Sequence, residues 1–372
     1  MTSSLRRPTR LRSRGDDGHR HRGAAVAHPA RAQIKTPVLD ALVVGGGPAG
    51  LSAALTLGRA RRRVLVLDTG RPANAMVDAV GGLLAQRGVA PIELRRSGRE
   101  QLREYPTVEL RCDEVLDAEP QAGGFAVSVD GDAPVRTRAL VIAHGLRYDP
   151  PPLPGIEGLW GRSVFHCPFC DGWEVRDRPL AVHGNGPAAA RSALLVAGWS
   201  SDVVLCTDGP AQLDGERPAL ARAGVRVREE PILRLIGSAG RLERIEFTTG
   251  PEERREALFV STRRGQPSDL AAALGCNLSD GGTIETDIDG RTSVPGVYAA
   301  GDAATEHSRS VANAIGTGSR VGYAVVLDAA PYTINARLIT PELEGRHLVE
   351  VMGREAVGRP RGVTVKTTRR AA

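Results

Sequence analysis

The sequence predicts an α/β protein in which one unit of parallel strands and helices is inserted into another of the same design. Two short apolar runs each end in a glycine-rich turn and pass into a helical pattern, and a third apolar run near residue 300 ends in Gly-Asp. Alternation of strand and helix patterns is typical of parallel sheets covered by helices. A chain of 372 residues with 41% hydrophobic content is long enough for two such units, each with its own core.

The first unit begins with a strand pattern, a tight turn and a helix pattern. The apolar run 38–44 ends at the turn 45–50 (G-G-G-P-A-G), and a second run, 64–67, ends at an acid twenty-one residues after Gly47. In such a turn the first glycine makes the bend, the second lets the backbone approach a pyrophosphate, and the third allows close helix packing, while the acid binds a ribose. We therefore predict a dinucleotide site formed by Gly45, Gly47, Pro48, Ala49, Gly50 and Asp68.

A second unit repeats this plan. The apolar run 180–183 ends at the turn 184–189 (G-N-G-P-A-A), a helix pattern follows, and the next strand pattern covers 203–206. Two such sites in one chain are what an enzyme needs to pass electrons between two nucleotide cofactors. An ordinary strand–turn–helix connection without a ligand stays open as the alternative. The expected contacts of the second site are Gly184, Gly186 and Ala189.

The end of the second strand in this unit bears on the choice of nucleotide. Asp208 and Gly209 stand where a site for NADP would place an arginine to pair with the 2′-phosphate. The carboxylate of Asp208 would repel that phosphate. If a nicotinamide nucleotide binds here, NADH is therefore a better electrostatic match than NADPH.

A Cys-x-x-Cys motif, Cys167-Pro168-Phe169-Cys170, precedes the second glycine turn. Two thiols at this spacing at the start of a helix can close a disulfide without backbone strain, and the helix N-terminus lowers their pKa. Because the thiolate is the nucleophile of disulfide exchange, we interpret the pair as a catalytic dithiol. A zinc half-site and a purely structural pair are the alternatives. The other cysteines are isolated and are expected to be buried small hydrophobic residues: Cys112, Cys206 and Cys276.

Two residues next to the cysteine pair could move the proton that dithiol–disulfide exchange requires. Asp171 follows Cys170 directly and is the preferred proton donor or acceptor. Its alternative role is that of an acid favoured by the dipole at a helix N-terminus. His166 could serve the same proton, or could simply form a hydrogen bond with the backbone.

A return to the first unit is indicated near residue 300. The segment 294–302 reads as a turn, a short strand and Gly301-Asp302, and the segment 309–318 reads as the start of a helix. A carboxylate at a strand end can accept hydrogen bonds from the ribitol of a flavin, and helix amides can stabilise the charge on a reduced flavin. A plain strand–loop–helix connection is the alternative. The residues assigned to the flavin are Gly301, Asp302, Arg309, Ser310 and Val311.

These patterns predict two Rossmann-like dinucleotide-binding domains, the second inserted in the first. The expected divisions of the chain are a disordered basic tail at 1–35, the first part of an FAD-binding domain at 36–154, an NAD(P)-binding-like domain with the Cys-x-x-Cys motif at 155–262, the second part of the FAD-binding domain at 263–330, and a C-terminal extension at 331–372.

From residue 38 to 330 the chain resembles the low-molecular-weight thioredoxin reductases, which belong to the flavoprotein disulfide reductases with two dinucleotide domains. The likeness is carried by four ordered motifs: G-G-G-P-A-G, C-P-F-C-D-G, the second glycine motif, and A-A-G-D followed by R-S-V-A-N-A-I-G-T-G. By this resemblance Cys170 faces the flavin, Cys167 attacks the substrate disulfide and Asp171 is the acid. The resemblance also implies a homodimer and a domain rotation that alternates flavin access between nicotinamide and the cysteines.

Three segments depart from that family. Thr207-Asp208-Gly209 replaces a His-Arg-Arg, Ala143-His144-Gly145 replaces Ala-Thr-Gly, and Arg309-Ser310-Val311 replaces Arg-Gln-Ala. The Pro-Phe between the cysteines, followed by Gly-Trp-Glu, is similar to a divergent bacterial and fungal branch. Some members of that branch are dithiol oxidases that close disulfides in small metabolites and pass the electrons to oxygen. The apolar Phe169 would suit an apolar small molecule at least as well as a protein.

The leading functional prediction is an FAD-dependent thiol–disulfide oxidoreductase that passes electrons from NADH or NADPH through FAD to the Cys167/Cys170 pair and on to a disulfide. Its partner would be a thioredoxin-like protein or a small-molecule dithiol or disulfide. An oxygen-using dithiol oxidase acting on a small metabolite is the alternative. A flavin-binding sensor without turnover is a third class, which retention of FAD without any reaction would favour.

Charge and composition exclude other classes of protein. The formal net charge is +6, but the basic excess lies in 1–35 and 331–372, and the part between them is net negative. We therefore expect no nucleic-acid partner. No apolar run approaches the length of a membrane span, and no metal site is expected. Five cysteines, an odd number, in a chain without a recognisable signal peptide favour a reducing compartment, and we expect the cytoplasm.

Overall fold

The first sheet is mainly parallel and combines strands from distant parts of the chain. The computed structural model describes residues 38–130, 133–306 and 308–330. The strands of this sheet follow the order β3-β2-β1-β6-β5-β4, and β17 pairs with β6. Their bounds are β1 (Leu39–Val44), β2 (Val64–Leu67), β3 (Val108–Arg111), β4 (Val115–Gln121), β5 (Gly124–Val129), β6 (Val135–Ile142) and β17 (Val297–Ala299).

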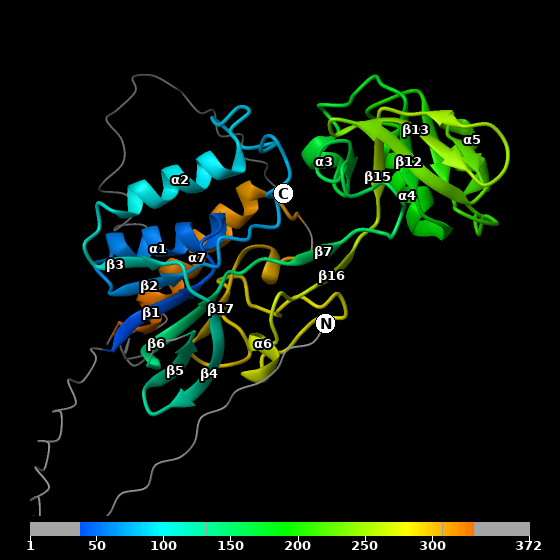
Figure 1. Cartoon of the computed structure of the whole chain (residues 1–372). Helices are drawn as coiled ribbons and strands as arrows, with labels where there is room; N and C mark the ends of the chain where they lie inside the picture. The colour runs from blue at the N-terminus through cyan, green and yellow to red at the C-terminus, as the bar shows by residue number, and fades with distance from the viewer. Residues whose placement is uncertain (1–37, 131–132, 307, 331–372) are drawn as a thin grey trace, which may run out of the picture. The chain divides into compact units, whose positions relative to one another are not determined.

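The central strands of this sheet are buried on both faces because their sequences are almost entirely apolar. Along β1 the side chains alternate between two cores: Ala41 and Val43 pack on the helical side, and Leu42 and Val44 pack on the other. The helices are α1 (Pro48–Arg59), α2 (Pro91–Leu102) and α7 (Val311–Asp328). Two short elements precede α7 in the sequence: α6 (Leu270–Ala273) and the 3₁₀ turn η1 (Gly301–Ala303). Helix α1 contacts both α2 and α7 (Figure 1).

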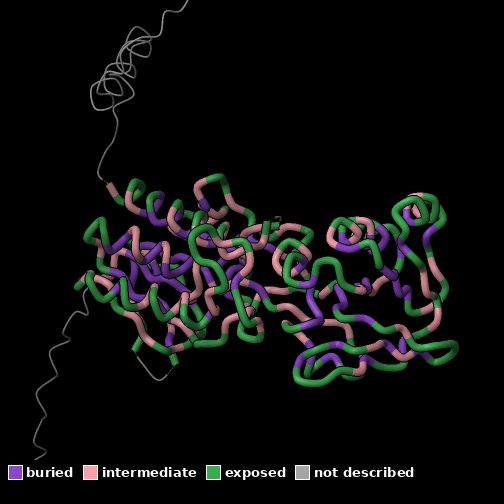
Figure 2. The backbone as a smooth tube through the Cα atoms, turned by 90° about the horizontal axis from the view of Figure 1, so that it is seen from above, coloured by how far each residue is buried: buried purple, intermediate pink, exposed green. Residues whose placement is uncertain are grey.

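A second parallel sheet is formed by residues 164–260. Its order is β11-β10-β9-β15-β8. The strands are β8 (Val164–Phe165), β9 (Leu180–His183), β10 (Val203–Cys206), β11 (Arg226–Arg228) and β15 (Ala257–Val260), and the helices are α3 (Pro168–Asp171), α4 (Gly186–Val196) and α5 (Arg217–Arg222). Strands β9, β10 and β15 are almost entirely buried, and Figure 2 shows buried residues concentrated in the interior of the described chain.

Two smaller antiparallel arrangements complete the described chain. One is a three-stranded sheet of β12 (Ile232–Ser238), β13 (Arg241–Phe247) and β14 (Glu253–Arg254); the other is a ribbon of β7 (Arg147–Asp149) and β16 (Arg263–Gly265). One face of the second parallel sheet packs on α4, and the other packs on the three-stranded sheet.

The predicted fold class, α/β with Rossmann-like domains, is confirmed by these parallel sheets and by the solved structures described below. The pairing of β17 with β6 supports the predicted insertion of the second unit in the first, whereas the exact domain boundaries stay a prediction. The expected basic tail and C-terminal extension lie outside the described residues. No helix in the described part of the chain has the length and apolarity to cross a membrane.

The prediction that the isolated cysteines are buried is wrong for one of them. Cys206 and Cys276 are buried, but Cys112 is exposed. It follows directly after β3, which is the edge strand of the first sheet, so no neighbouring strand covers it.

The contact between α1 and α7 depends on a glycine. A Cβ on Gly318 would overlap the carbonyl oxygen of Ala49, whereas a Cβ on Gly316, two residues earlier on the same helix, would meet nothing within 4 Å. We expect Gly318→Ala to lower the free energy of unfolding by about 1–3 kcal/mol through overpacking. Gly316→Ala should be neutral or raise it by up to about 1 kcal/mol, since alanine favours helix. Urea unfolding of both variants, followed by circular dichroism, measures the difference; equal stability would mean that α7 does not approach α1 this closely.

Candidate functional site

The first glycine turn is shaped to accept an anionic group. Gly45 has a φ of 104°, in the left-handed region, and a Cβ on Gly50 would overlap the carbonyl oxygen of Gly45. These two glycines therefore bring α1 close to the end of β1. Gly47 caps α1 without any side-chain hydrogen bond, and a Cβ there would meet nothing within 4 Å. The helix N-terminus, with Pro48 and Ala49 in its first turn, thus keeps room for a phosphate.

Asp68 lies beside this turn, as predicted, but its carboxylate already has cationic partners. A Cβ on Gly46 would lie 2.8 Å from the Cβ of Asp68. The side chain of Asp68 is 13% exposed and pairs with Arg95 at 2.7 Å and with Arg99. Burial opposes ionisation, but the hydrogen bond and charge of Arg95 outweigh it and hold the pKa of Asp68 below its ordinary value. Asp68 is therefore a fixed anion at the place where a ribose would lie.

The Gly-Asp pair before α7 forms a second part of the same cradle. Gly301 has a φ of 69°, and a Cβ on it would lie 2.9 Å from the Cβ of Ala49 in the first turn. Asp302 accepts a hydrogen bond of 2.8 Å from the hydroxyl of Tyr148 on β7. Burial raises the pKa of Asp302, and the bond from Tyr148 opposes this shift. Tyr148 was not predicted, because 154 residues separate it from its partner.

The start of α7 supplies further groups. The Ser310 side chain caps the helix by accepting a hydrogen bond of 3.2 Å from the amide of Asn313, and Val311 is the first helical residue. Within the described chain, the Nε of Arg309 is buried without a hydrogen-bond partner.

The residues present fit FAD. The uncapped turn at Gly47 suits its pyrophosphate, Asp68 its ribose and Asp302 its ribitol, while the start of α7 and Arg309 suit the pyrimidine end of the flavin. The assignment of each of these residues to FAD stays a prediction.

The two cysteines of the Cys-x-x-Cys motif form a disulfide. Cys167 and Cys170 have Cα atoms 5.3 Å apart and lie at the ends of a turn in which Cys167 caps α3. The Sγ of Cys170 lies 4.0 Å from the carbonyl oxygen of Arg309, next to the start of α7. A Cβ on Gly81 would overlap the carbonyl oxygen of Cys170, so the backbone of the first unit also contacts this turn. These contacts bring the predicted redox pair and the predicted flavin segment together.

Asp171 has the properties of a proton donor at neutral pH. Its burial, together with the negative charge of Glu174, raises the pKa of Asp171 from an ordinary value of 3.8 to about 7. A group that is half protonated near pH 7 can both give and take a proton in that range.

His166 has the opposite character. Its ring stacks on Tyr148 at 4.6 Å and on Trp160 at 5.8 Å, although part of the side chain faces solvent. Desolvation of the ring, together with the charges of Arg264 and Arg309, lowers the pKa of His166 to about 4. His166 is therefore neutral at pH 7, which favours Asp171 over His166 as the acid.

Two large apolar side chains next to the disulfide are exposed. Phe169, between the cysteines, is 74% exposed and meets the ring of Trp199 edge-on at 5.7 Å. Trp173 is 65% exposed and carries the guanidinium of Arg176 over its ring at 4.0 Å. Exposed aromatic residues beside a reactive group are a typical contact surface for an apolar substrate.

The second glycine turn differs from the first in its polar contacts. Gly184 and Gly186 have φ values of 146° and 77°, and Ala189 is buried against the sheet. Between the glycines, the Asn185 side chain accepts a hydrogen bond of 2.8 Å from the amide of Gly186 and thereby caps α4. The role of Asn185 was not predicted, although asparagine before a helix pattern is a recognised capping signal.

Comparisons with known proteins agree with this geometry. Residues 39–318 match the model of the pyridine nucleotide-disulphide oxidoreductase family. Thioredoxin reductase tcpT of Claviceps purpurea is 31% identical over 301 residues, covering 77% of this chain and 92% of that protein, and thioredoxin reductase sirT of Leptosphaeria maculans is 29% identical with similar coverage.

Solved structures give the same result. The crystal structure of HlmI is 37% identical and covers 85% of this chain and 97% of its own, with a TM-score of 0.73. The putative thioredoxin reductase TrxB from Bacillus anthracis is 30% identical and covers 78% of this chain and 98% of its own, with a TM-score of 0.74.

Removal of the acid at the first turn should weaken cofactor binding. We expect Asp68→Ala to lower FAD affinity by roughly tenfold or more, because a charged hydrogen-bond acceptor is lost and Arg95 loses its partner. Titration of FAD into the apoprotein, followed by flavin fluorescence, measures this. Glu100→Ala removes an exposed acid from the same helix that carries Arg95 and is the matched control. Equal affinity of Asp68→Ala and the control would contradict the assignment of the first turn.

The raised pKa of Asp171 predicts how exchange depends on pH. Thiol release from an alkyl disulfide by the prereduced protein should fall above pH 7, as the acid form of Asp171 is lost. Asp171→Asn should be roughly 100-fold slower and lack this descending limb. Glu174→Gln should keep the limb but move it to lower pH, because one source of the shift is removed. Quenched-flow thiol assays from pH 5.5 to 9 give the profiles.

The same shift acts on stability with a defined sign. Between pH 3.8 and about 7 the native state holds a proton on Asp171 that the unfolded chain has released, so the free energy of unfolding falls as pH rises through this window. Asp171→Asn should remove this part of the dependence. An unchanged exchange profile and an unchanged stability profile in that variant would together show that Asp171 titrates normally.

Proposed function

The chain belongs to the pyridine nucleotide-disulphide oxidoreductase family, in its thioredoxin reductase-like branch, and we propose that its Cys167–Cys170 pair exchanges two electrons with an apolar disulfide or dithiol. Membership makes it an FAD-dependent thiol–disulfide oxidoreductase, and the family's cofactors are FAD and a pyridine nucleotide. One observation carries the proposal: a disulfide next to the start of α7 is followed directly by an acid whose pKa is about 7.

The reducing direction can be written with the residues of this chain. The thiolate of Cys167 attacks one sulfur of the substrate disulfide; a mixed disulfide forms, the substrate S–S bond breaks, and the leaving sulfur takes a proton from Asp171. Asp171, now a carboxylate, takes the proton of the Cys170 thiol. The thiolate of Cys170 then attacks the sulfur of Cys167, the mixed disulfide breaks, the protein disulfide closes, and the second substrate sulfur leaves with that proton. FAD, when bound, would supply the two-electron chemistry that returns the pair to its dithiol form.

The assignment of roles within the pair is supported by position. The Sγ of Cys170 lies against the carbonyl oxygen of Arg309, on the side where the predicted flavin segment begins. Cys170 therefore suits the inner role, and Cys167, which caps the turn, suits the attack on the substrate. The ring of His166 stacks on Tyr148 and Trp160 and thereby fixes the backbone next to Cys167. Because His166 is neutral at pH 7, it adds no positive charge beside the cysteine pair.

For the electron donor we propose NADH over NADPH. Asp208 follows β10, where a ribose would be recognised, and its carboxylate disfavours a 2′-phosphate. The arginines on the neighbouring strand β11, Arg226 and Arg228, are paired with Glu253.

A second candidate is the reverse reaction, in which the Cys167–Cys170 disulfide oxidises a small dithiol and oxygen is the final acceptor. The exposed rings of Phe169 and Trp173 favour this candidate, because they offer an apolar surface to a small molecule at the disulfide. The polar contacts of the second glycine turn favour it as well, since they occupy groups that a nicotinamide nucleotide would use.

We also propose a homodimer in a reducing compartment such as the cytoplasm. The dimer rests on the resemblance to thioredoxin reductases. The compartment is supported by the three cysteines that stay unpaired, Cys112, Cys206 and Cys276, because oxidising compartments favour paired cysteines.

Anaerobic reduction tests the proposal and separates the two directions. Bleaching of the visible flavin band by NADH, and much less by NADPH, is expected for the reductase. Bleaching by a dithiol only, with recovery in air, would instead identify the oxidase. A protein that retains FAD but is bleached by neither kind of reductant would overturn both and would favour a sensor.

Cys170→Ser is the control for this test. The variant should bind FAD normally, because no predicted cofactor contact changes, but a dithiol should no longer bleach its flavin. Bleaching of this variant by a dithiol at the normal rate would remove the cysteine pair from the pathway.

A further inference from the structure

The second glycine turn is joined by its own side chain to the loop after β10. The Oδ1 of Asn185 accepts hydrogen bonds of 2.8 Å from the amides of Gly186 and Gln212, and the Nδ2 of Asn185 donates one of 2.9 Å to the carbonyl oxygen of Pro210. In a Rossmann-like domain a dinucleotide passes between these same two loops, with its pyrophosphate on the glycine turn and its ribose at the end of the second strand. The three bonds of Asn185 therefore cross the path of the nucleotide.

The first domain of the same chain shows the contrast. There, Gly47 caps α1 without a side-chain hydrogen bond, and a Cβ on Gly47 would meet nothing within 4 Å. In the second domain Asn185 caps α4 and occupies the amide of Gly186, the first residue of the helix. One helix N-terminus is open to an anion, and the other is closed by a neutral side chain.

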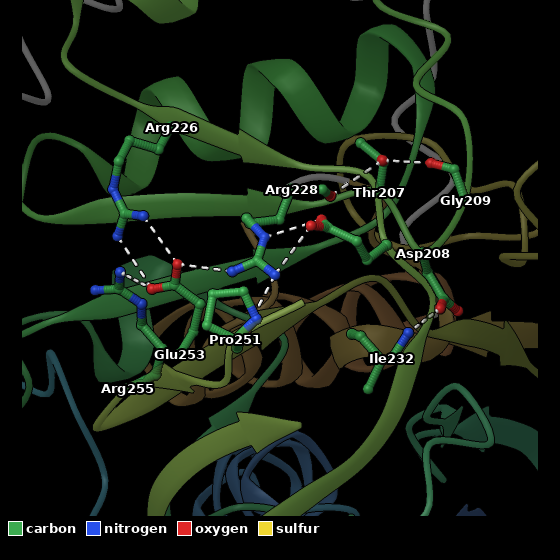
Figure 3. A network of polar contacts seen from close by, with 10 residues as sticks. Thr207, Asp208, Gly209, Arg226, Arg228, Ile232, Pro251, Glu253 and Arg255 are labelled. Carbon is green, nitrogen blue, oxygen red and sulfur yellow. Dashed lines mark hydrogen bonds and ion pairs between the residues drawn. The ribbon is translucent and has the colours of Figure 1, made fainter. Parts of the chain in front are cut away.

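The acid at the strand end is also occupied. Asp208 has a φ of 53°, in the left-handed region, and its carboxylate accepts a hydrogen bond of 2.6 Å from the amide of Ile232, at the start of β12 (Figure 3). On its other oxygen it lies 3.6 Å from the Nε2 of His183, the last residue of β9. The carboxylate of Asp208 thus joins the end of β10 to the start of β12 and to the end of β9.

The arginines near this strand end are neutralised in the same way. Arg226, Arg228 and Arg255 surround the carboxylate of Glu253, as Figure 3 shows. The pKa of Glu253 is lowered to about 2, mainly by the hydrogen bond from Arg226 and further by those from Arg255 and Arg228. Burial alone would raise this pKa. Each of these arginines also pairs with a second acid, Arg226 and Arg255 with Asp202 and Arg228 with Glu230, so this cluster does not present an unpaired cation to a phosphate.

We propose that Asn185 is a latch that closes the second nucleotide site, so that this chain binds a nicotinamide nucleotide only when the loop 210–212 moves away. The latch makes nucleotide binding weak, and it therefore favours the second candidate, the dithiol oxidase, over the NADH-dependent reductase. This proposal rests on the proposed function only for the redox role of the Cys167–Cys170 pair. Nucleotide binding itself can be measured without any redox reaction.

The test uses ADP-ribose, which has the adenosine, pyrophosphate and second ribose of NADH but cannot be oxidised or reduced. Its dissociation constant is measured by calorimetry on the FAD-loaded full chain. We expect Asn185→Gly to bind ADP-ribose at least about fivefold more tightly than the natural sequence, as expected when a net hydrogen bond worth about 1 kcal/mol no longer has to be broken. ADP-ribose 2′-phosphate should bind more weakly than ADP-ribose to both proteins, because the carboxylate of Asp208 remains in both.

Asn277→Gly is the matched control, because it makes the same substitution at an exposed asparagine outside both glycine turns. It should bind ADP-ribose like the natural sequence. Tight binding by the natural sequence, or equal binding by Asn185→Gly and Asn277→Gly, would overturn the latch.

A second measurement covers the case in which Asn185→Gly does not fold. In the natural sequence without nucleotide, the amide of Gln212 should exchange slowly with deuterium, because it donates to Asn185. Fast exchange at this amide would mean that the latch does not form. Neither outcome depends on electron transfer, so bleaching by a dithiol still tests the proposed function separately.

Discussion

The pairing of β17 with β6 is the interaction on which the candidate site depends. It joins residues 297–299 to residues 140–142 in a parallel register, although the whole second sheet lies between them in the sequence. Since β17 leads directly into Gly301 and Asp302, this register sets where they stand relative to the first glycine turn. Helix α7 then returns over α1, where Gly318 allows the two backbones to touch. The cradle that fits FAD thus exists only when both distant parts of the first unit are folded together.

The charge states of two buried aspartates are set by their surroundings. The carboxylate of Asp68 stays ionised in a mostly buried position because two arginines compensate it, while Asp171 has no such compensation and its pKa rises. The same residue type is therefore a fixed anion in one place and a group that titrates near neutral pH in the other. In the first case the neighbours on α2 lower the pKa against the effect of burial; in the second case burial raises the pKa, and the charge of Glu174 adds to that effect.

The sequence was most informative where the signal is local. Strands β1, β2, β9 and β10 and the starts of α1, α4 and α7 could be predicted, because each combines an apolar run or a helix pattern with a glycine turn or a cap. Helix α2 could not be predicted, since its sequence is rich in arginine and contains few apolar residues. The antiparallel sheet β12–β14 was missed as well: β12 and β13 are only partly buried, and neither is a continuous apolar run that ends in a glycine turn.

The residues of the candidate site fall into two groups, those that local motifs reveal and those that only the fold brings together. The cysteine pair, Asp171 and the glycine turns are visible in short motifs, whereas the partners that tune them come from elsewhere in the chain. Tyr148 reaches Asp302 from the β7 strand, and Arg95 and Arg99 reach Asp68 from α2. The spacing of these arginines, four residues apart on one helix face, is the only local sign of their shared target. Family membership is confirmed by the comparisons, while the role of each site residue stays a prediction.

The exposure of Cys112 sets the number of sulfhydryls that a reagent can reach while the Cys167–Cys170 disulfide is closed. All five cysteines lie in the described residues, and two of the three free ones are buried. A thiol reagent applied to the native, oxidised protein therefore meets one accessible sulfhydryl, on the edge of the first sheet. After reduction of the Cys167–Cys170 disulfide the number rises, because the sulfur of the partly exposed Cys167 becomes free to react. Counting reactive sulfhydryls thus reports whether the pair is open or closed, independently of any cofactor and of any colour.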